Sequence, residues 1–232
     1  MWTLALACAF FLCIHLMVSG TSLKEQIIGR IGGTAYYVLF SILSVAGLIC
    51  MSVAFAAARN DALNHKFWDA PLPLGIISIV VNFLAFFLVV LGITTPSPTN
   101  LLALWNMPDK SVYGVVRISR HPVLAGIGLW AFIHLICNGN LASWLFFGSL
   151  LGVCAIGANN IDRKRVAMMG PTYESVMRRT SIVPFVAIIE GRTAFAPEEL
   201  GIARMFLALS MFAMFAMLHE LLFIARILHH SA

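Results

Sequence analysis

Charged residues are scarce in this chain. Only 11% of its 232 residues are Asp, Glu, Lys or Arg, whereas 60% are hydrophobic. A soluble domain usually carries about 25% charged residues, so this composition excludes an ordinary water-soluble fold. Internal repeats, low-complexity tracts and blocks of like charge are also missing, which excludes a repeat architecture and a charged interaction tail. The sequence therefore predicts a single integral membrane domain over residues 1–232.

Cysteine is present, but no cysteine motif is. All five cysteines lie in apolar segments, and none is spaced as Cys-x-x-Cys. We interpret them as small buried hydrophobic residues rather than as a disulfide framework. The absence of Cys-x-x-Cys-His also excludes covalent attachment of a c-type haem.

Long apolar runs are what the sequence has in abundance. A helix needs roughly 20 mainly apolar residues to cross a bilayer. Six segments fit this length and predict an all-α, polytopic bundle of about six transmembrane helices: residues 2–19, 34–57, 72–94, 122–138, 141–158 and 201–227. The first lacks the charged start and the cleavage site of a signal peptide, so we expect it to remain as a span. Only Gly139 and Asn140 join the fourth and fifth, which predicts a tight antiparallel hairpin.

The distribution of positive charge predicts the orientation. Twelve of the fifteen Lys and Arg residues follow the first, third or fifth span. Because basic loops stay in the cytoplasm, we expect both termini on the non-cytoplasmic side and the segment 159–200 in the cytoplasm. Within it, residues 173–179 are expected to form a short surface helix. The net charge of +5 suits contact with anionic lipid and requires no nucleic acid.

Four of the seven histidines lie inside or at the edge of apolar segments: His15, His121, His134 and His219. An ionisable side chain in hydrocarbon is costly, so it indicates a function, and imidazole is the commonest metal ligand. In the expected orientation, His15 near the end of the first span and His121 at the start of the fourth share the cytoplasmic leaflet. His134 lies 13 residues further on, about 20 Å along a helix, in the outer half with His219.

The inner pair of histidines fits a haem. Three arginines border the same surface, and an extended loop that begins at Pro96 is expected to cover it. Two axial imidazoles, an apolar ring inside the bundle and propionates at interfacial arginines would together hold haem b. We therefore predict His15 and His121 as metal ligands. The other predicted cofactor-binding residues are Arg30, Arg117, Arg120 and His134.

Simpler roles remain as alternatives at each of these positions. His121 could only cap a helix, because it precedes Pro122 and proline favours the first helical turn. His15 could only hydrogen-bond a neighbouring backbone group or Ser19. His134 and His219 could join helices by hydrogen bonds without binding a ligand.

Several motifs together resemble the NnrU family, over nearly the whole chain. They are His15 with Ser19 and Gly29-Arg30, then Arg117-Ile118-Ser119-Arg120-His121-Pro122 with Gly126, Trp130 and His134, and finally Thr180-Ser181, Pro184-Phe185 and Gly191-Arg192. The resemblance implies a bacterial membrane protein associated with nitric oxide and nitrite metabolism in denitrification. The plastid zeta-carotene isomerases resemble NnrU proteins in this domain. They imply haem b with axial ligands at His15 and His121, and isomerase or redox chemistry on a lipophilic substrate.

Two further interpretations stay open. The Arg-His-Pro start with Gly126, and the later Gly-x-x-Tyr, are similar to isoprenylcysteine carboxyl methyltransferases, which implies binding of S-adenosylmethionine. In this chain Leu124 replaces the tyrosine of that family, and Asn160-Ile161-Asp162 stands where it has an acidic pair. The third interpretation is a non-catalytic membrane protein that supports assembly of a respiratory complex. The substrate and the oligomeric state are not encoded in any motif that we identify.

Overall fold

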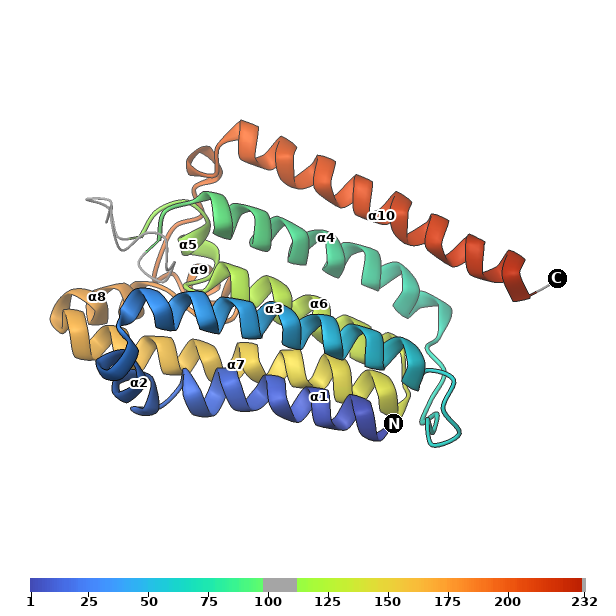
Figure 1. The fold of residues 1–232 in the computed structure, drawn as a ribbon. Helices are drawn as coiled ribbons and strands as arrows, with labels where there is room; N and C mark the ends of the chain where they lie inside the picture. The colour runs from blue at the N-terminus through green and yellow to red at the C-terminus, as the bar shows by residue number, and fades with distance from the viewer. Residues whose placement is uncertain (98–111, 231–232) are drawn as a thin grey trace. The chain divides into compact units, whose positions relative to one another are not determined.

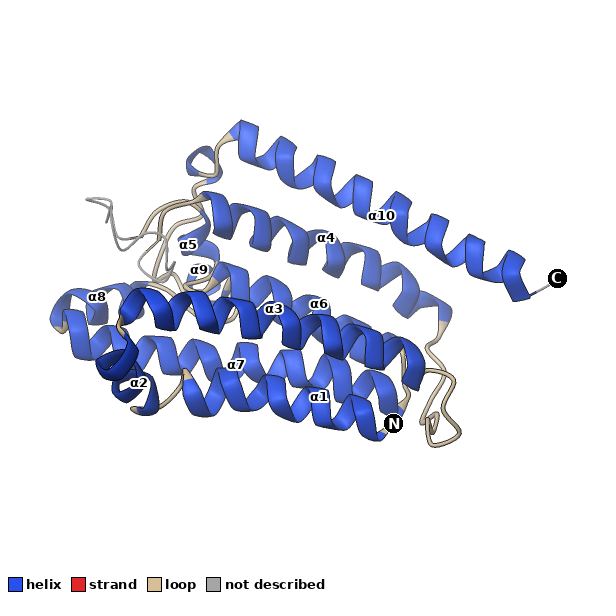
Figure 2. Ribbon diagram, viewed as in Figure 1, coloured by secondary structure: helices blue, strands red, loops and turns tan. Residues whose placement is uncertain are grey.

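The computed structural model describes residues 1–97 and 112–230, with side chains described up to residue 219 (Figure 1). Within these ranges the chain is helical, and its one β-bridge joins Lys66 to Asn140 (Figure 2). The elements in chain order are α1 (Trp2–Leu12), η1 (Cys13–Val18), α2 (Leu23–Ile31), α3 (Gly33–Ala58), α4 (Leu72–Thr94), α5 (Val115–Ile118), α6 (Pro122–Cys137), α7 (Leu141–Met169), α8 (Pro171–Arg179), α9 (Val186–Ile189), η3 (Pro197–Glu199) and α10 (Ile202–His230). The predicted all-α membrane class is confirmed.

Each of the six predicted spans is helical, but they differ in length. Four helices are long and apolar enough to cross a membrane: α3, α4, α7 and the part of α10 up to His219. The first predicted span, α1 with η1, is followed by α2 at a bend of 82°, and this pair counts as a fifth candidate. The fourth predicted span, α6, has only 16 residues, which is short for a bilayer. The orientation of the termini stays a prediction.

The chain divides into two compact units, which are described separately. The first unit comprises Met1–Val81 and Ile127–Pro171, and the second comprises Asn82–Gly126 and Thr172–Ala232. This division neither confirms nor contradicts the prediction of one domain over residues 1–232.

The core of the first unit lies between α1, α3 and α7, which run side by side (Figure 1). Small residues such as Ala54, Ala58 and Ala142 are buried there and allow close helix approach. The thiol of Cys8 donates a hydrogen bond to the Leu145 carbonyl at 3.3 Å. All five cysteines are free, as expected, but Cys13 and Cys50 are exposed rather than buried. Both lie on apolar helices, and only one side of each helix packs against the core, so the cysteines on the other side are exposed.

The predicted hairpin between α6 and α7 is confirmed. Asn140 is the N-cap of α7, and its side chain accepts a hydrogen bond from the Ser143 N–H. The indole of Trp68 donates to the Ile136 carbonyl at 2.8 Å and so fixes the preceding loop against the end of α6. Asn140 therefore ends the turn by starting the next helix.

In the second unit, α4 and α6 approach closely at a glycine. A Cβ atom added to Gly126 would lie 2.6 Å from the Ala85 carbonyl oxygen, so no larger residue fits there. The predicted surface helix at 173–179 is confirmed as α8, which buries Tyr173. Most of the predicted covering loop, from position 98 on, lies outside the described residues.

Candidate functional site

His15 lies in η1, a π-helical segment at the end of the first predicted span. Such segments are rare and often occur at functional sites. The Nδ1 atom of His15 lies 2.9 Å from the Phe11 carbonyl oxygen. Because a carbonyl only accepts hydrogen bonds, Nδ1 carries the proton and Nε2 keeps the lone pair. The half-buried ring packs against Phe11 and Phe40, with centroids 4.1 and 5.3 Å away.

His134 repeats this arrangement on α6, in the same unit. Its Nδ1 lies 2.8 Å from the carbonyl oxygen of Trp130, one turn earlier. Its ring packs against Trp130 and against Phe147 of α7, with centroids 4.9 and 5.0 Å away. The backbone carbonyl therefore selects the same tautomer in both histidines. Metal-binding histidines commonly have their second nitrogen fixed in this way.

His121 is buried, with 3% of its surface exposed, directly before the first residue of α6. Ser119 precedes it in an extended conformation that ends α5. The Ser119 hydroxyl accepts a hydrogen bond from the His121 N–H at 3.3 Å and donates one to the Ile182 carbonyl at 2.7 Å. A single hydroxyl can do both. Ser119 therefore connects His121 to a segment sixty residues later.

That segment, residues 180–187, is called the strap below. The Arg120 N–H donates to the Ser181 carbonyl at 2.7 Å, and the Phe185 N–H donates to the Ile118 carbonyl at 2.9 Å. The Ser181 hydroxyl accepts from the Ala187 N–H at 3.0 Å, which folds the strap back on itself. These contacts tie the strap to both sides of Ser119. The position of the His121 backbone is consequently set by the strap as well as by α6.

Phe185 in the strap has a left-handed backbone conformation, with φ of 67°. A bulky residue rarely adopts this conformation, which costs about 1–2 kcal/mol. Such strain persists only where the surroundings hold it, and it is concentrated at functional sites. Here the hydrogen bond from Phe185 to Ile118 and the start of α9 hold it.

Arg117 forms a two-pronged ion pair with Glu199 of η3. Its Nε and Nη2 atoms donate to the two carboxylate oxygens at 2.7 and 2.8 Å, and Nη1 donates to the Thr193 hydroxyl. The Gly114 N–H also donates to the Glu199 carboxylate. The hydrogen bond with Glu199 raises the pKa of Arg117. All three guanidinium nitrogens thus have protein partners, so Arg117 joins α5 to the segment before α10.

Arg120 and Arg192 converge on Thr180 at the start of the strap. Arg120, with 6% of its surface exposed, donates from Nη1 to the Thr180 carbonyl at 3.2 Å and lies 3.3 Å from its hydroxyl. Arg192 donates to the same carbonyl and to that of Arg178. Two guanidinium groups therefore hold one end of the strap.

The remaining predicted positions are exposed. Arg30 lies in the last turn of α2 and has no ion pair among the described residues. His219 lies on the exposed surface of α10. Within residues 1–97 and 112–219, no three His, Cys, Asp or Glu side chains gather as a metal site.

The predicted cofactor residues fall into two groups. The first unit holds His15, Arg30 and His134, and the second holds Arg117, Arg120 and His121. The structure brings the second group together, since those residues lie in one short segment against the strap. The pairing of His15 with His121 joins two units and stays a prediction.

Sequence reasoning missed Glu199 and the role of the strap. Glu199 is one of only ten acidic residues in the chain, and it follows Pro197. The ten carboxylates are outnumbered by fifteen Lys and Arg residues, and this was a usable signal, because each carboxylate then has several cations with which it could form an ion pair. The hydrogen bonds of Thr180 and Ser181 have no comparable signal in the sequence.

These features define the class of the protein: a helical, multi-pass membrane protein whose Arg-His-Pro segment, at residues 120–122, is held by hydrogen bonds to the strap. A family model described as NnrU protein matches residues 3–227, and the chain belongs to this family. The predicted resemblance is thereby confirmed. No solved structure matches the chain.

Two curated relatives are both described as 15-cis-zeta-carotene isomerases. The chain is 33% identical over 175 residues to the chloroplastic 15-cis-zeta-carotene isomerase of Arabidopsis thaliana, covering 73% of this chain and 46% of the relative. It is 30% identical over 177 residues to the chloroplastic 15-cis-zeta-carotene isomerase of Zea mays, covering 74% and 46%. The chain thus spans about half the length of the curated relatives it matches. It is a membrane protein similar to isomerases.

Proposed function

We propose that this protein is a membrane isomerase that acts on a double bond of a lipophilic, conjugated polyene. The similarity to two carotene isomerases supports this substrate class, and so do the apolar helices, which give access to a substrate dissolved in lipid. Isomerisation changes the geometry of a bond and leaves the atom and electron count of the substrate unchanged. The bacterial inner membrane, with residues 159–200 in the cytoplasm, is the proposed location.

The proposed cofactor is haem b, with His15 and His121 as axial ligands. The observation that carries this proposal is the anchoring of His15. Its Nδ1 is committed to the Phe11 carbonyl, so Nε2 is the nitrogen that can ligate iron. A haem needs only one or two protein ligands, so the absence of a cluster of three is compatible with it. His121 is buried and held by Ser119, as a rigid ligand requires.

The protein residues would control what reaches the iron. When bound, haem would supply an iron. If both histidines ligate it, no other ligand can bind until one histidine leaves. The aromatic rings of Phe11 and Phe40 keep water from the His15 side. Arg120 and Arg30 are the proposed partners of the acidic haem edge. Arg117 would help to hold this segment in place through its ion pair with Glu199. Nitric oxide, which the family association suggests, would have to replace one of the two histidines.

The test is a conversion assay in detergent or nanodiscs. Purified protein, loaded with haem, is incubated with a cis-configured polyene, and the isomers are separated by chromatography. We expect conversion by the wild type and its loss in His121→Ala, while His65→Ala, an exposed loop variant, remains active. Equal conversion by wild type and His121→Ala would refute the proposal. Saturable S-adenosylmethionine binding without haem absorbance would instead support the methyltransferase alternative.

A further inference from the structure

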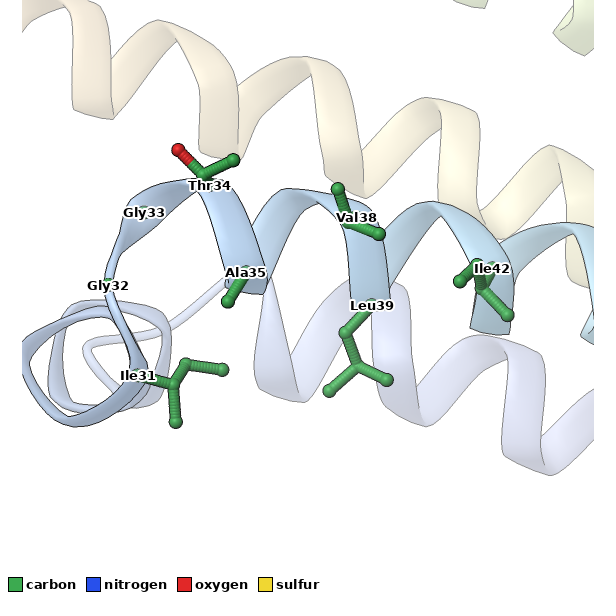
Figure 3. Close-up of a pocket in the computed structure, with 8 residues that line it drawn as sticks. All are labelled: Ile31, Gly32, Gly33, Thr34, Ala35, Val38, Leu39 and Ile42. Atoms are coloured by element: carbon green, nitrogen blue, oxygen red, sulfur yellow. The ribbon is translucent and has the colours of Figure 1, made fainter.

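A shallow apolar hollow of about 600 Å³, open to its surroundings over most of its extent, lies at the elbow between α2 and α3 and is called the cavity below (Figure 3). Its apolar side chains, such as Leu39 and Ile42, are about half exposed. Its walls are the end of α2 and the first two turns of α3. Figure 3 shows Ala35 and Leu39 on the same side of α3, as their spacing of four residues within one helix requires, and Ile31 at the end of α2 on that side as well. Val38 and Ile42 extend the apolar wall along α3. The cavity belongs wholly to the first unit and contains none of the predicted haem ligands.

Two glycines lie at the elbow. Gly32 has φ of 83°, a conformation that lets α2 end and the chain turn into α3. Gly33 follows as the first residue of α3, and a Cβ atom added there would meet nothing within 4 Å. The room at Gly33 is therefore not filled by neighbouring side chains. Within the described protein, it is open space next to an apolar wall.

The helix that borders the cavity has the character of an interfacial helix. The pair of α1 with η1 and α2 is bent by 82°, and no residue of α2 is buried in the protein. Leu23 and Ile31 are exposed although they are apolar. A short helix with exposed apolar and cationic residues, set steeply against a span, is typical of the level where lipid headgroups meet acyl chains.

The charge beside the cavity is positive. Arg30 is exposed next to Ile31 and has no ion pair among the described residues. Lys24 lies 5.2 Å from the Tyr37 ring centroid, at the start of α3. The one acidic residue of α2, Glu25, has Lys164 of α7 within 3.7 Å. The elbow therefore combines an apolar cavity with a cation that lacks a counter-ion, which is the complement of an anionic amphiphile.

We propose that this elbow binds one anionic phospholipid. An acyl chain occupies the cavity along Ile31, Leu39 and Ile42, and the acidic headgroup lies at Arg30. An uncharged polyene would use the apolar wall alone, so the requirement for Arg30 distinguishes the two. Arg30 is also a proposed partner of the haem edge, so the test below uses protein without haem, and the lipid site then holds or fails independently of the isomerase proposal.

The test uses photoactivatable lipids. The full chain is reconstituted in nanodiscs with a trace of phosphatidylglycerol that carries a diazirine in its acyl chain, or with the phosphatidylcholine analogue. After illumination, labelled peptides are mapped by mass spectrometry. We expect phosphatidylglycerol to label the peptide with residues 31–42 above all other exposed helices. Because one cation near the membrane surface favours an anionic lipid about fivefold, Arg30→Gln should lower this labelling about fivefold and leave phosphatidylcholine labelling unchanged.

A second variant tests the cavity itself. Gly33→Leu fills the open space without a clash and should abolish labelling of residues 31–42. The matched control is Gly75→Leu on α4, where an added Cβ atom also meets nothing within 4 Å and which does not line the cavity. Labelling that follows exposure along all helices, that is the same for both lipids, or that survives Gly33→Leu overturns the proposal. Displacement of the lipid by an uncharged polyene with equal efficiency in Arg30→Gln and wild type also overturns it.

Discussion

The ion pair of Arg117 with Glu199 offers the sharpest test of the second unit. The substitution Glu199→Gln keeps the shape of the side chain and removes its charge. It weakens two hydrogen bonds to Arg117 and one to the Gly114 N–H. The guanidinium is then left beside a neutral amide in a site where both side chains are less than one fifth exposed.

The magnitude follows from the type of bond and the burial. A hydrogen bond to a charged group contributes about 1.5–3 kcal/mol, and the loss of one partner leaves the other poorly solvated. The amide oxygen in the place of Oε2 can still accept from Arg117 Nε and the Gly114 N–H, whereas the bond from Nη2 is lost, so we expect a loss of about 2 kcal/mol in the free energy of unfolding. For a chain of this length, that corresponds to a decrease of about 4–8 °C in the melting temperature.

The assay is thermal unfolding of the detergent-purified protein, followed by size-exclusion chromatography of the remaining folded fraction. The control is Glu198→Gln, which changes the neighbouring, exposed carboxylate. Exposed carboxylates contribute little, so this variant should melt within about 2 °C of the wild type. Equal melting temperatures for the two variants would refute the structural role that we assign to Arg117 and Glu199.

Two further predictions concern local conformation. Phe185→Gly should be more stable than Phe185→Ala by about 1 kcal/mol, because both lose the ring and only glycine adopts the positive φ without strain; a more stable alanine variant in the same melting assay would contradict this. Asn140→Ala should destabilise the protein by about 1 kcal/mol through loss of the α7 cap, whereas Asn140→Asp, which keeps the accepting oxygen, should restore stability. Equal melting of the alanine and aspartate variants would argue against the cap.

Apolar periodicity and length made the main helices predictable. A run such as residues 72–94 has no alternative to a helix in a bilayer, because every backbone group must be satisfied within its own segment. The structure places α4 at these same bounds. The end of the first span is marked by Ser19-Gly20-Thr21-Ser22, which is typical of a break between helices, but these residues do not encode the bend of 82° at which α2 follows.

The sequence indicated which residues are candidates, but it said less about what surrounds each of them. The histidines were found because imidazole is unusual in hydrocarbon. Their tautomers were not, because these depend on which carbonyl lies one turn earlier, at Phe11 and Trp130. The residues of the strap stood out through the family motif, but their role did not, because most of the hydrogen bonds that the strap makes to residues 118–120 use its backbone groups, which are the same in every residue.

The most direct test of the proposed haem site is the electron paramagnetic resonance spectrum of the ferric, haem-loaded protein. With His15 and His121 both bound, the wild type should be low-spin, and each alanine variant should become high-spin and return to low-spin when free imidazole is added. A low-spin spectrum that persists in His15→Ala or in His121→Ala without imidazole would contradict the assignment of that histidine.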